Sequence, residues 1–186
     1  MKIRLAAYLQ PDSIVDGEGI RTVIWTQGCP HNCLGCHNPE THDISGGALV
    51  ELEKVYEIID KLEGQNGITF SGGDPFCQPK ECAEIAKYAR RKGYNIWTYT
   101  GYEFEQLLLM AKSKPEILDF LKQIDVLVDG KFVLAKKSYN AIFRGSYNQR
   151  IIDVTKSLEE NNVVLVQKYL DKKKSSNRQK AEGVYI

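Results

Sequence analysis

The sequence lacks the features of a membrane-bound or exported protein. None of its apolar runs approaches the roughly 20 residues that a membrane-spanning helix requires. The N-terminus, MKIRLAAYLQPDS, has neither the apolar stretch nor the small-residue cleavage site of a signal peptide. The net charge is only +1, with Lys and Arg interspersed among Asp and Glu, so no basic surface for nucleic acid or an anionic membrane is indicated. We therefore expect a cytoplasmic protein that binds neither.

Cysteine is scarce and odd in number. The chain has five cysteines, which does not suit a disulfide framework, and thiols stay reduced in the cytoplasm. Three of the five stand close together, at Cys29, Cys33 and Cys36, in the stretch TQGCPHNCLGCHNPET over residues 26–41. Clustered cysteines in a reducing compartment more often bind metal or take part in chemistry than pair as disulfides.

The length and composition indicate one globular domain. The chain has 186 residues, of which 42% are hydrophobic and 26% charged. We predict a single domain over residues 1–170. The end of the chain, including DKKKSSNRQKAEG over 171–183, is polar and rich in charge. Residues 171–186 are therefore predicted to form a flexible tail, with a basic docking arm as the alternative.

Strand-like and helix-like segments alternate along the chain. Apolar spacing predicts helices over 50–63, 79–92, 104–111 and 115–121, and strands over 20–26, 67–74, 95–101, 124–130 and 163–166. Such alternation is typical of an α/β domain with a parallel sheet and right-handed crossovers. A closed eight-fold barrel takes about 250 residues. We therefore expect a partial, incomplete parallel β/α barrel.

The predicted strands end in similar turns. They run into TQGC, FSGG, TYTG and VDG, each with a glycine and polar neighbours at the carboxyl end of the strand. In α/β folds this is the end at which ligands bind. The sequence therefore predicts that the chemistry is gathered on one rim of the sheet.

The three clustered cysteines allow several kinds of site. Thiolates suit zinc, Cu(I) and iron–sulfur clusters. A structural zinc ion needs four ligands, and His31, His37 or His42 could supply the fourth. A four-iron cluster has four corners, so three cysteines would hold three irons and leave one open. A chance group of buried cysteines is the remaining alternative.

The sequence around the cysteines resembles that of a known family. The spacing C-x3-C-x2-C resembles the signature of the radical S-adenosylmethionine (SAM) enzymes, and the wider match resembles one branch, the activating enzymes of anaerobic (class III) ribonucleotide reductases. Glu18 departs from it, standing where the family usually has proline. The matching stretches are DGEGIR (16–21), GCPHNCLGCHNPET (28–41), FSGGDP (70–75), TYTGY (98–102), DVLVDGKF (125–132) and FRGSYNQRIIDV (143–154).

The resemblance implies an iron–sulfur oxidoreductase with a fold of the radical SAM type. It implies one 4Fe-4S cluster held by Cys29, Cys33 and Cys36, whose open iron binds SAM. Reductive cleavage of SAM would give a 5′-deoxyadenosyl radical, which generates a glycyl radical on the large subunit of the reductase. A low-potential donor such as flavodoxin would supply the electron. The alternatives are activation of another glycyl-radical enzyme, such as pyruvate formate-lyase, and a zinc-stabilised binding module without catalysis.

The resemblance also implies cofactor contacts, each with a plainer alternative. The SAM-contacting residues are expected to be Gly35, Cys36, His37, Gly72, Gly73, Asp74, Asp129, Lys131 and Arg144, with further contacts from Thr100 and Tyr102 to the ribose. Asp74 could instead cap a helix before Pro75, since aspartate commonly does so. Asp129 and Lys131 could form a surface ion pair, and Arg144 and Arg150 could lie solvated in a loop.

The sequence also gives expectations for the DGEGIR stretch, the two other cysteines and the three histidines. The resemblance places DGEGIR, with Arg21, near the mouth of the cluster site, whereas its glycines alone are explained by a tight turn. Cys82 shares a helix face with Ile85 and is predicted to be a core thiol, and Cys77 is predicted to be structural. The three histidines are expected to donate to the sulfurs of the cluster and tune its potential.

Overall fold

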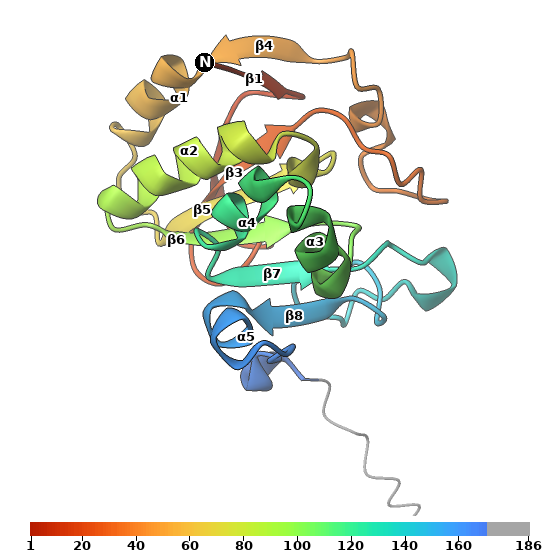
Figure 1. Ribbon diagram of the computed structural model, residues 1–186. Coiled ribbons are helices and arrows are strands. Elements are labelled where there is room, and N and C mark those ends of the chain that lie inside the picture. The colour runs from red at the N-terminus through yellow and green to blue at the C-terminus, as the bar shows by residue number, and fades with distance from the viewer. Residues whose placement is uncertain (171–186) are drawn as a thin grey trace, which may run out of the picture.

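The computed structural model describes residues 1–170, arranged as one mixed sheet with helices against it (Figure 1). The predicted tail over 171–186 lies outside the described residues. The sheet order is β4-β1-β3-β5-β6-β7-β8, and β2 pairs with β3 off this path. The strands are β1 (Lys2–Leu5), β2 (Gln10–Ser13), β3 (Arg21–Thr26), β4 (Ala48–Glu51), β5 (Gly67–Gly72), β6 (Asn95–Tyr99), β7 (Val126–Asp129) and β8 (Arg150–Asp153).

The centre of the sheet is parallel, as predicted. Strands β3, β5, β6 and β7 are neighbours in chain order, and each pairs in parallel with the next. The flanks are not parallel: β1 and β2 run antiparallel to β3, β4 to β1, and β8 to β7. The prediction of a parallel sheet therefore holds for the central strands and not for the flanks. The four flanking strands have four residues each, too short to show a clear apolar pattern.

The four predicted helices are present. They are α1 (Leu52–Ile59), α2 (Pro79–Arg91), α3 (Phe104–Ala111) and α4 (Pro115–Leu121), and a further helix, α5 (Val154–Glu160), follows β8. The strand predicted over 163–166 is reduced to a single bridge between Leu165 and Ile152 of β8. This segment follows α5 and runs beside β8 without extending the sheet.

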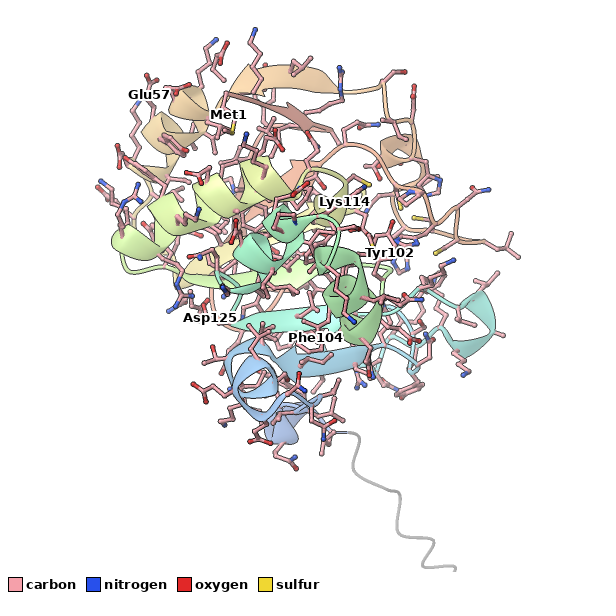
Figure 2. All side chains as sticks on the ribbon, viewed as in Figure 1. Met1, Glu57, Tyr102, Phe104, Lys114 and Asp125 are labelled. Carbon is pink, nitrogen blue, oxygen red and sulfur yellow. The ribbon has the colours of Figure 1, made fainter. Side chains whose placement is uncertain are left out.

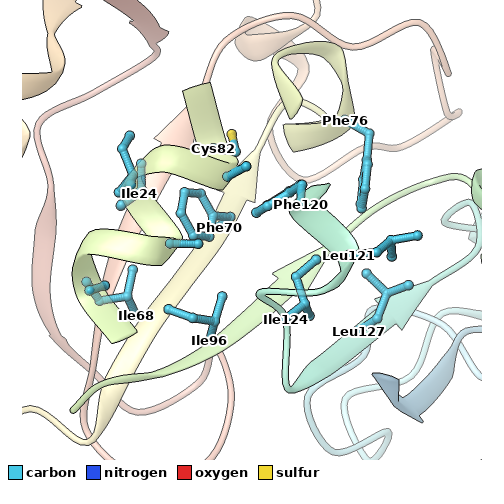
Figure 3. Packing of buried hydrophobic residues seen from close by; sticks show 14 of the residues in the cluster. Ile24, Ile68, Phe70, Phe76, Cys82, Ile96, Phe120, Leu121, Ile124 and Leu127 are labelled. Carbon is cyan, nitrogen blue, oxygen red and sulfur yellow. The ribbon is translucent and has the colours of Figure 1, made fainter. Parts of the chain in front are cut away.

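The main core lies between one face of the sheet and the helices. Ile68, Phe70 and Ile96 of the sheet pack against side chains of α2 and α4, among them Phe120 (Figure 3). Cys82 of α2 is fully buried in the same cluster, so its prediction as a core thiol is confirmed. Burying an aliphatic or aromatic side chain contributes about 2 kcal/mol. The helical face therefore carries most of the stability, and a smaller apolar cluster of Trp97, Val128 and Ile151 lies on the other face.

That other face is closed at the amino ends of the central strands. Arg21, the first residue of β3, is fully buried, and its guanidinium lies 5.4 Å from the ring centre of Trp97. The Nε atom of Arg21 donates to Thr69 Oγ1 at 2.6 Å. Phe143 and Tyr169 pack edge-on against Trp97. Burial lowers the pKa of Arg21 to about 10, so the side chain stays charged at neutral pH.

None of the helices within residues 1–170 is both long enough and apolar enough to cross a bilayer.

Candidate active site

A cavity of about 610 Å³ opens at the carboxyl ends of the parallel strands. It lies on the face of the sheet opposite the main core, above the side chains that close the amino ends. Trp25 of β3, Ser71 of β5 and Tyr99 of β6 form its base. Loops after these strands form its walls. Many of the residues predicted to share one rim of the sheet therefore line this cavity, among them Gly72, Gly73 and Thr100.

The loop after β3 brings the three cysteines to the cavity. We call residues 28–37 the cysteine loop. Its start is fixed by hydrogen bonds from Gly28 N to Thr41 O at 2.8 Å and from Cys29 N to His42 O at 3.2 Å. Gly28 and Gly35 have φ values of +98° and +72°, which favour glycine and let the loop reverse direction. The loop projects from the molecule on the side where Tyr102 lies (Figure 2).

The three thiols form a donor set that suits an iron–sulfur cluster. Cys29, Cys33 and Cys36 all line the cavity and none forms a disulfide. Within residues 1–170, no group of three His, Cys, Asp or Glu side chains converges closely enough to hold a single metal ion. A four-iron cluster binds its thiolates at separate corners and does not require them to meet at one point. The donor set, three soft ligands on one loop, fits such a cluster.

Burial affects the first of these thiols. It raises the pKa of Cys29 to about 11. In the metal-free protein this thiol is therefore protonated at neutral pH, and binding of iron must expel the proton. Assembly of a cluster should accordingly release protons and become more favourable as the pH rises above neutrality.

The three histidines have different surroundings. His42 lines the cavity, and its Nε2 atom is buried without a hydrogen-bond partner in the described part of the chain. His37 also lines the cavity and packs against the ring of Phe132, with ring centres 4.9 Å apart. His31 instead bonds to Asp74. Of the three, His42 is the one with a buried ring nitrogen that has no hydrogen-bond partner within residues 1–170.

The predicted glycine turn lies against the base of the cysteine loop. Gly73 N donates to Thr26 O at 2.7 Å, and Asp74 N donates to Gly28 O at 2.8 Å. A Cβ atom on Gly73 would lie 2.4 Å from Gly28 O, so only glycine permits this close approach. Gly72 and Gly73 both line the cavity. The turn thus brings bare backbone to the same space as the cysteines.

Asp74 also lines the cavity, but its carboxylate already accepts several hydrogen bonds from the protein. Only 1% of the residue is exposed. It accepts hydrogen bonds from Phe76 N at 3.0 Å, Gly101 N at 3.0 Å and Thr100 Oγ1 at 2.9 Å, and its Oδ2 atom lies 2.6 Å from His31 Nε2. The bond from Phe76 N is the capping role that the sequence left open as the alternative. A carboxylate accepts about four hydrogen bonds, so this one has little capacity left for a ligand.

Asp129 lies outside the residues that line the cavity. It is 1% exposed and pairs with Arg150, whose Nε atom donates to Asp129 Oδ1 at 3.0 Å. Asp129 also accepts from Phe104 N at the start of α3, and Arg150 pairs in addition with Glu105. These bonds raise the pKa of Arg150 and lower that of Glu105. Arg150 is therefore held in two ion pairs, so the alternative of a solvated loop arginine is not supported.

The other predicted contact residues divide into two groups. Arg144 lines the cavity, on the loop between β7 and β8, and its guanidinium donates to Gln149 O at 3.3 Å. Thr100 lines it as well. Gly35 and Lys131 do not belong to the lining, and Lys131 is exposed. Tyr102 contacts the cavity only through His31, against whose ring it packs edge-on.

The stretch DGEGIR is divided between the two ends of the sheet. Asp16 lines the cavity, together with Ile14 and Val15 before it. Arg21 lies at the amino end of β3, among the side chains that close the other end. The expectation that Arg21 lies near the cluster mouth is therefore wrong, because the length of β3 separates it from the cysteine loop.

The fold and the cavity together define an iron–sulfur protein, with three cysteines on a loop at the carboxyl edge of a parallel sheet. A family model described as a 4Fe-4S single cluster domain matches residues 15–152. The zinc-stabilised module is not favoured.

The relatives are more specific. The chain is 33% identical to the anaerobic ribonucleoside-triphosphate reductase-activating protein of Haemophilus influenzae, over 77% of this chain and 96% of that protein. It is 35% identical to the proteins of the same name from Escherichia coli K12, over 75% of this chain and 92% of that protein, and from Enterobacteria phage T4, over 77% and 90%. The chain belongs to this family of reductase-activating proteins.

Among solved structures, QueE from Escherichia coli is similar over about half of the chain. The TM-score is 0.43 and the sequence identity 14%, over 54% of this chain and 53% of that one. The overlap is too partial to inform the function.

Proposed function

We propose that the protein activates an anaerobic ribonucleoside-triphosphate reductase by generating a glycyl radical on its large subunit, with SAM as the source of the radical. The observation that carries the proposal is that Cys29, Cys33 and Cys36 line one cavity with the glycine turn at Gly72 and Gly73. Membership of the family of activating proteins supports the choice of partner.

The cysteine loop would hold a 4Fe-4S cluster through its three thiolates. A bound cluster would supply the electron that breaks the S–C5′ bond of SAM, which would give methionine and a 5′-deoxyadenosyl radical. That radical would take the hydrogen atom from a glycine Cα. The chain's own part is to place these groups and to exclude competing reactions. Three cysteines suit this role, because a fourth would fill the iron position that SAM needs.

The residues around the cavity fit different parts of SAM. We assign the bare backbone of Gly72 and Gly73 to the methionyl end, where close approach is needed, and Arg144 to the carboxylate. Cys36 and His37 lie on the cysteine loop and are assigned to the adenine side. Asp74 is assigned to the support of this site through its hydrogen bonds, and direct contact with the ammonium group would require one of its present donors to move.

The open sheet suits a protein substrate. We propose that it acts as an incomplete barrel in which the partner's glycine-bearing segment reaches the cavity. Four apolar side chains that line the cavity are also strongly exposed to solvent: Ile14, Val15, Tyr139 and Ile142. Exposed apolar groups around a polar site are typical of a surface that another protein covers. A low-potential one-electron donor, such as a flavodoxin, would reduce the cluster.

An anaerobic assay tests the proposal in two stages. Reconstituted and chemically reduced protein should convert SAM to equal amounts of methionine and 5′-deoxyadenosine, measured by chromatography. With the reductase added, the glycyl radical should appear in its electron paramagnetic resonance spectrum. Protein that holds iron but never cleaves SAM would contradict the proposed chemistry. Cleavage without a radical on the reductase would contradict the choice of partner, and pyruvate formate-lyase would be the next partner to assay.

A further inference from the structure

The middle of the cysteine loop has very few bonds to the rest of the protein. Within the described residues, the backbone of residues 30–35 forms no hydrogen bond to a residue outside the loop. Leu34 is 80% exposed, and Asn32 takes a left-handed conformation with φ at 47°. In the part of the chain that the structure describes, the hydrogen bond between His31 and Asp74 is the one that joins this segment to the sheet.

His31 stands between two of the three cysteines and is firmly seated. Its side chain is only 6% exposed, and its Nε2 atom lies 2.6 Å from Asp74 Oδ2. Tyr102 packs edge-on against the ring, with ring centres 4.5 Å apart. The ring therefore sits in a fitted site at the ends of β5 and β6, and it links the cysteine loop to the glycine turn that precedes Asp74.

Gly101 provides the space for this ring. A Cβ atom at Gly101 would lie 2.3 Å from Cδ2 of His31, far inside van der Waals contact. The three nearest atoms to that Cβ position all belong to the His31 ring. Gly101 N also donates to Asp74 Oδ2. The need for glycine at this position thus arises from the imidazole and not from the backbone conformation.

We propose that His31 is a positioning residue that pins the cysteine loop to Asp74 and so holds Cys29 and Cys33 in place for the cluster. Three other donors bond to Asp74, namely Phe76 N, Thr100 Oγ1 and Gly101 N. The carboxylate therefore remains fixed when the imidazole is absent, and the loop alone loses its attachment. The inference rests on the proposed function only in that the cysteines hold an iron–sulfur cluster.

The test measures how fast the cluster is lost. Reconstituted protein is mixed anaerobically with a ferrous chelator, and the release of iron is followed by absorbance. Loss of a hydrogen bond to a charged group weakens an attachment enough to expect release about tenfold faster from H31A than from the wild type. H31Q keeps a donor of similar reach and should release iron at an intermediate rate. The paramagnetic spectrum of the reduced cluster should broaden in H31A, because the cysteines take a wider range of positions.

Alanine at Gly101 moves the same ring without removing any of its bonding atoms. G101A should therefore also release iron faster than the wild type. Because both changes act on one contact, the double variant H31A/G101A should release iron no faster than H31A alone. L34A is the matched control, since Leu34 lies in the same loop and is exposed; it should behave as the wild type.

Three results would overturn the proposal. They are release from H31A at the wild-type rate, release from H31Q as fast as from H31A, and a double variant that loses iron much faster than either single variant. None of these measurements uses SAM or the reductase. Failure of the proposed function in the activity assay therefore leaves this test intact, and the reverse also holds.

Discussion

Alanine at Cys29, Cys33 or Cys36 should reduce the iron content of anaerobically reconstituted protein from about four atoms per chain to nearly none. The three thiols line one cavity, and no other cysteine shares its lining. With two thiolates left, half of the corners of a four-iron cluster would have no protein ligand. Iron and sulfide assays, with the visible absorbance of the cluster, measure the loss, and SAM cleavage should disappear with it.

The two remaining cysteines provide the controls. Cys77 does not line the cavity, and Cys82 is fully buried in the main core. C77A and C82A should therefore keep the wild-type iron content, although C82A loses some stability through the space it leaves in the core. If C77A also lost its iron, the assignment of the three ligands would be wrong. A colourless wild-type protein that holds one zinc ion would refute the cluster itself.

The second large effect is expected at Arg150. R150A would leave the carboxylate of Asp129 buried without its cationic partner, and removing one member of a buried pair costs about 3 kcal/mol or more. We expect a loss of about 3 kcal/mol in the free energy of unfolding. Urea denaturation of the metal-free protein under reducing conditions, followed by circular dichroism, measures it.

Two further variants make this test specific. R150A/D129N removes the uncompensated charge and should recover part of the loss, because the introduced amide is neutral and its oxygen could still accept from Phe104 N. E105A removes the exposed partner of Arg150 and should cost less than about 1 kcal/mol. If R150A were as stable as the wild type yet failed to support radical formation on the reductase, Arg150 would belong to the docking surface instead.

The sequence predicted those parts of the fold whose signal is local. Strands β5, β6 and β7 were recognisable because they are apolar runs that end in glycine turns, and α2 because Cys82 and Ile85 recur at helical spacing. Strand β8 was missed because Arg150 and Asp153 made the stretch RIID read as part of a polar loop. Its partner β7 determines its conformation, and the pairing joins residues distant in the sequence.

The candidate site divides in the same way. The spacing of the three cysteines and the pair Gly72-Gly73 can be recognised from the sequence alone. The bond of His31 to Asp74 and the pairing of Arg150 with Asp129 join residues that are 43 and 21 positions apart. Nothing in the sequence alone distinguishes a histidine that tunes a cluster from one that anchors a loop. The reason for a glycine at position 101 is also hidden in the sequence, because it depends on the imidazole of His31 that packs against it.

The closed amino end of the central strands limits how a polypeptide could enter the cavity. Within residues 1–170, Arg21, Trp97 and Tyr169 pack together at that end, so the cavity opens at the carboxyl edge and not at the amino edge. A chain cannot be threaded through it from one side to the other and must come back out the way it went in. The residue that reacts must then stand at the apex of a tight bend or close to a chain terminus. Glycine is well suited to such an apex, since it turns the backbone sharply at no steric cost.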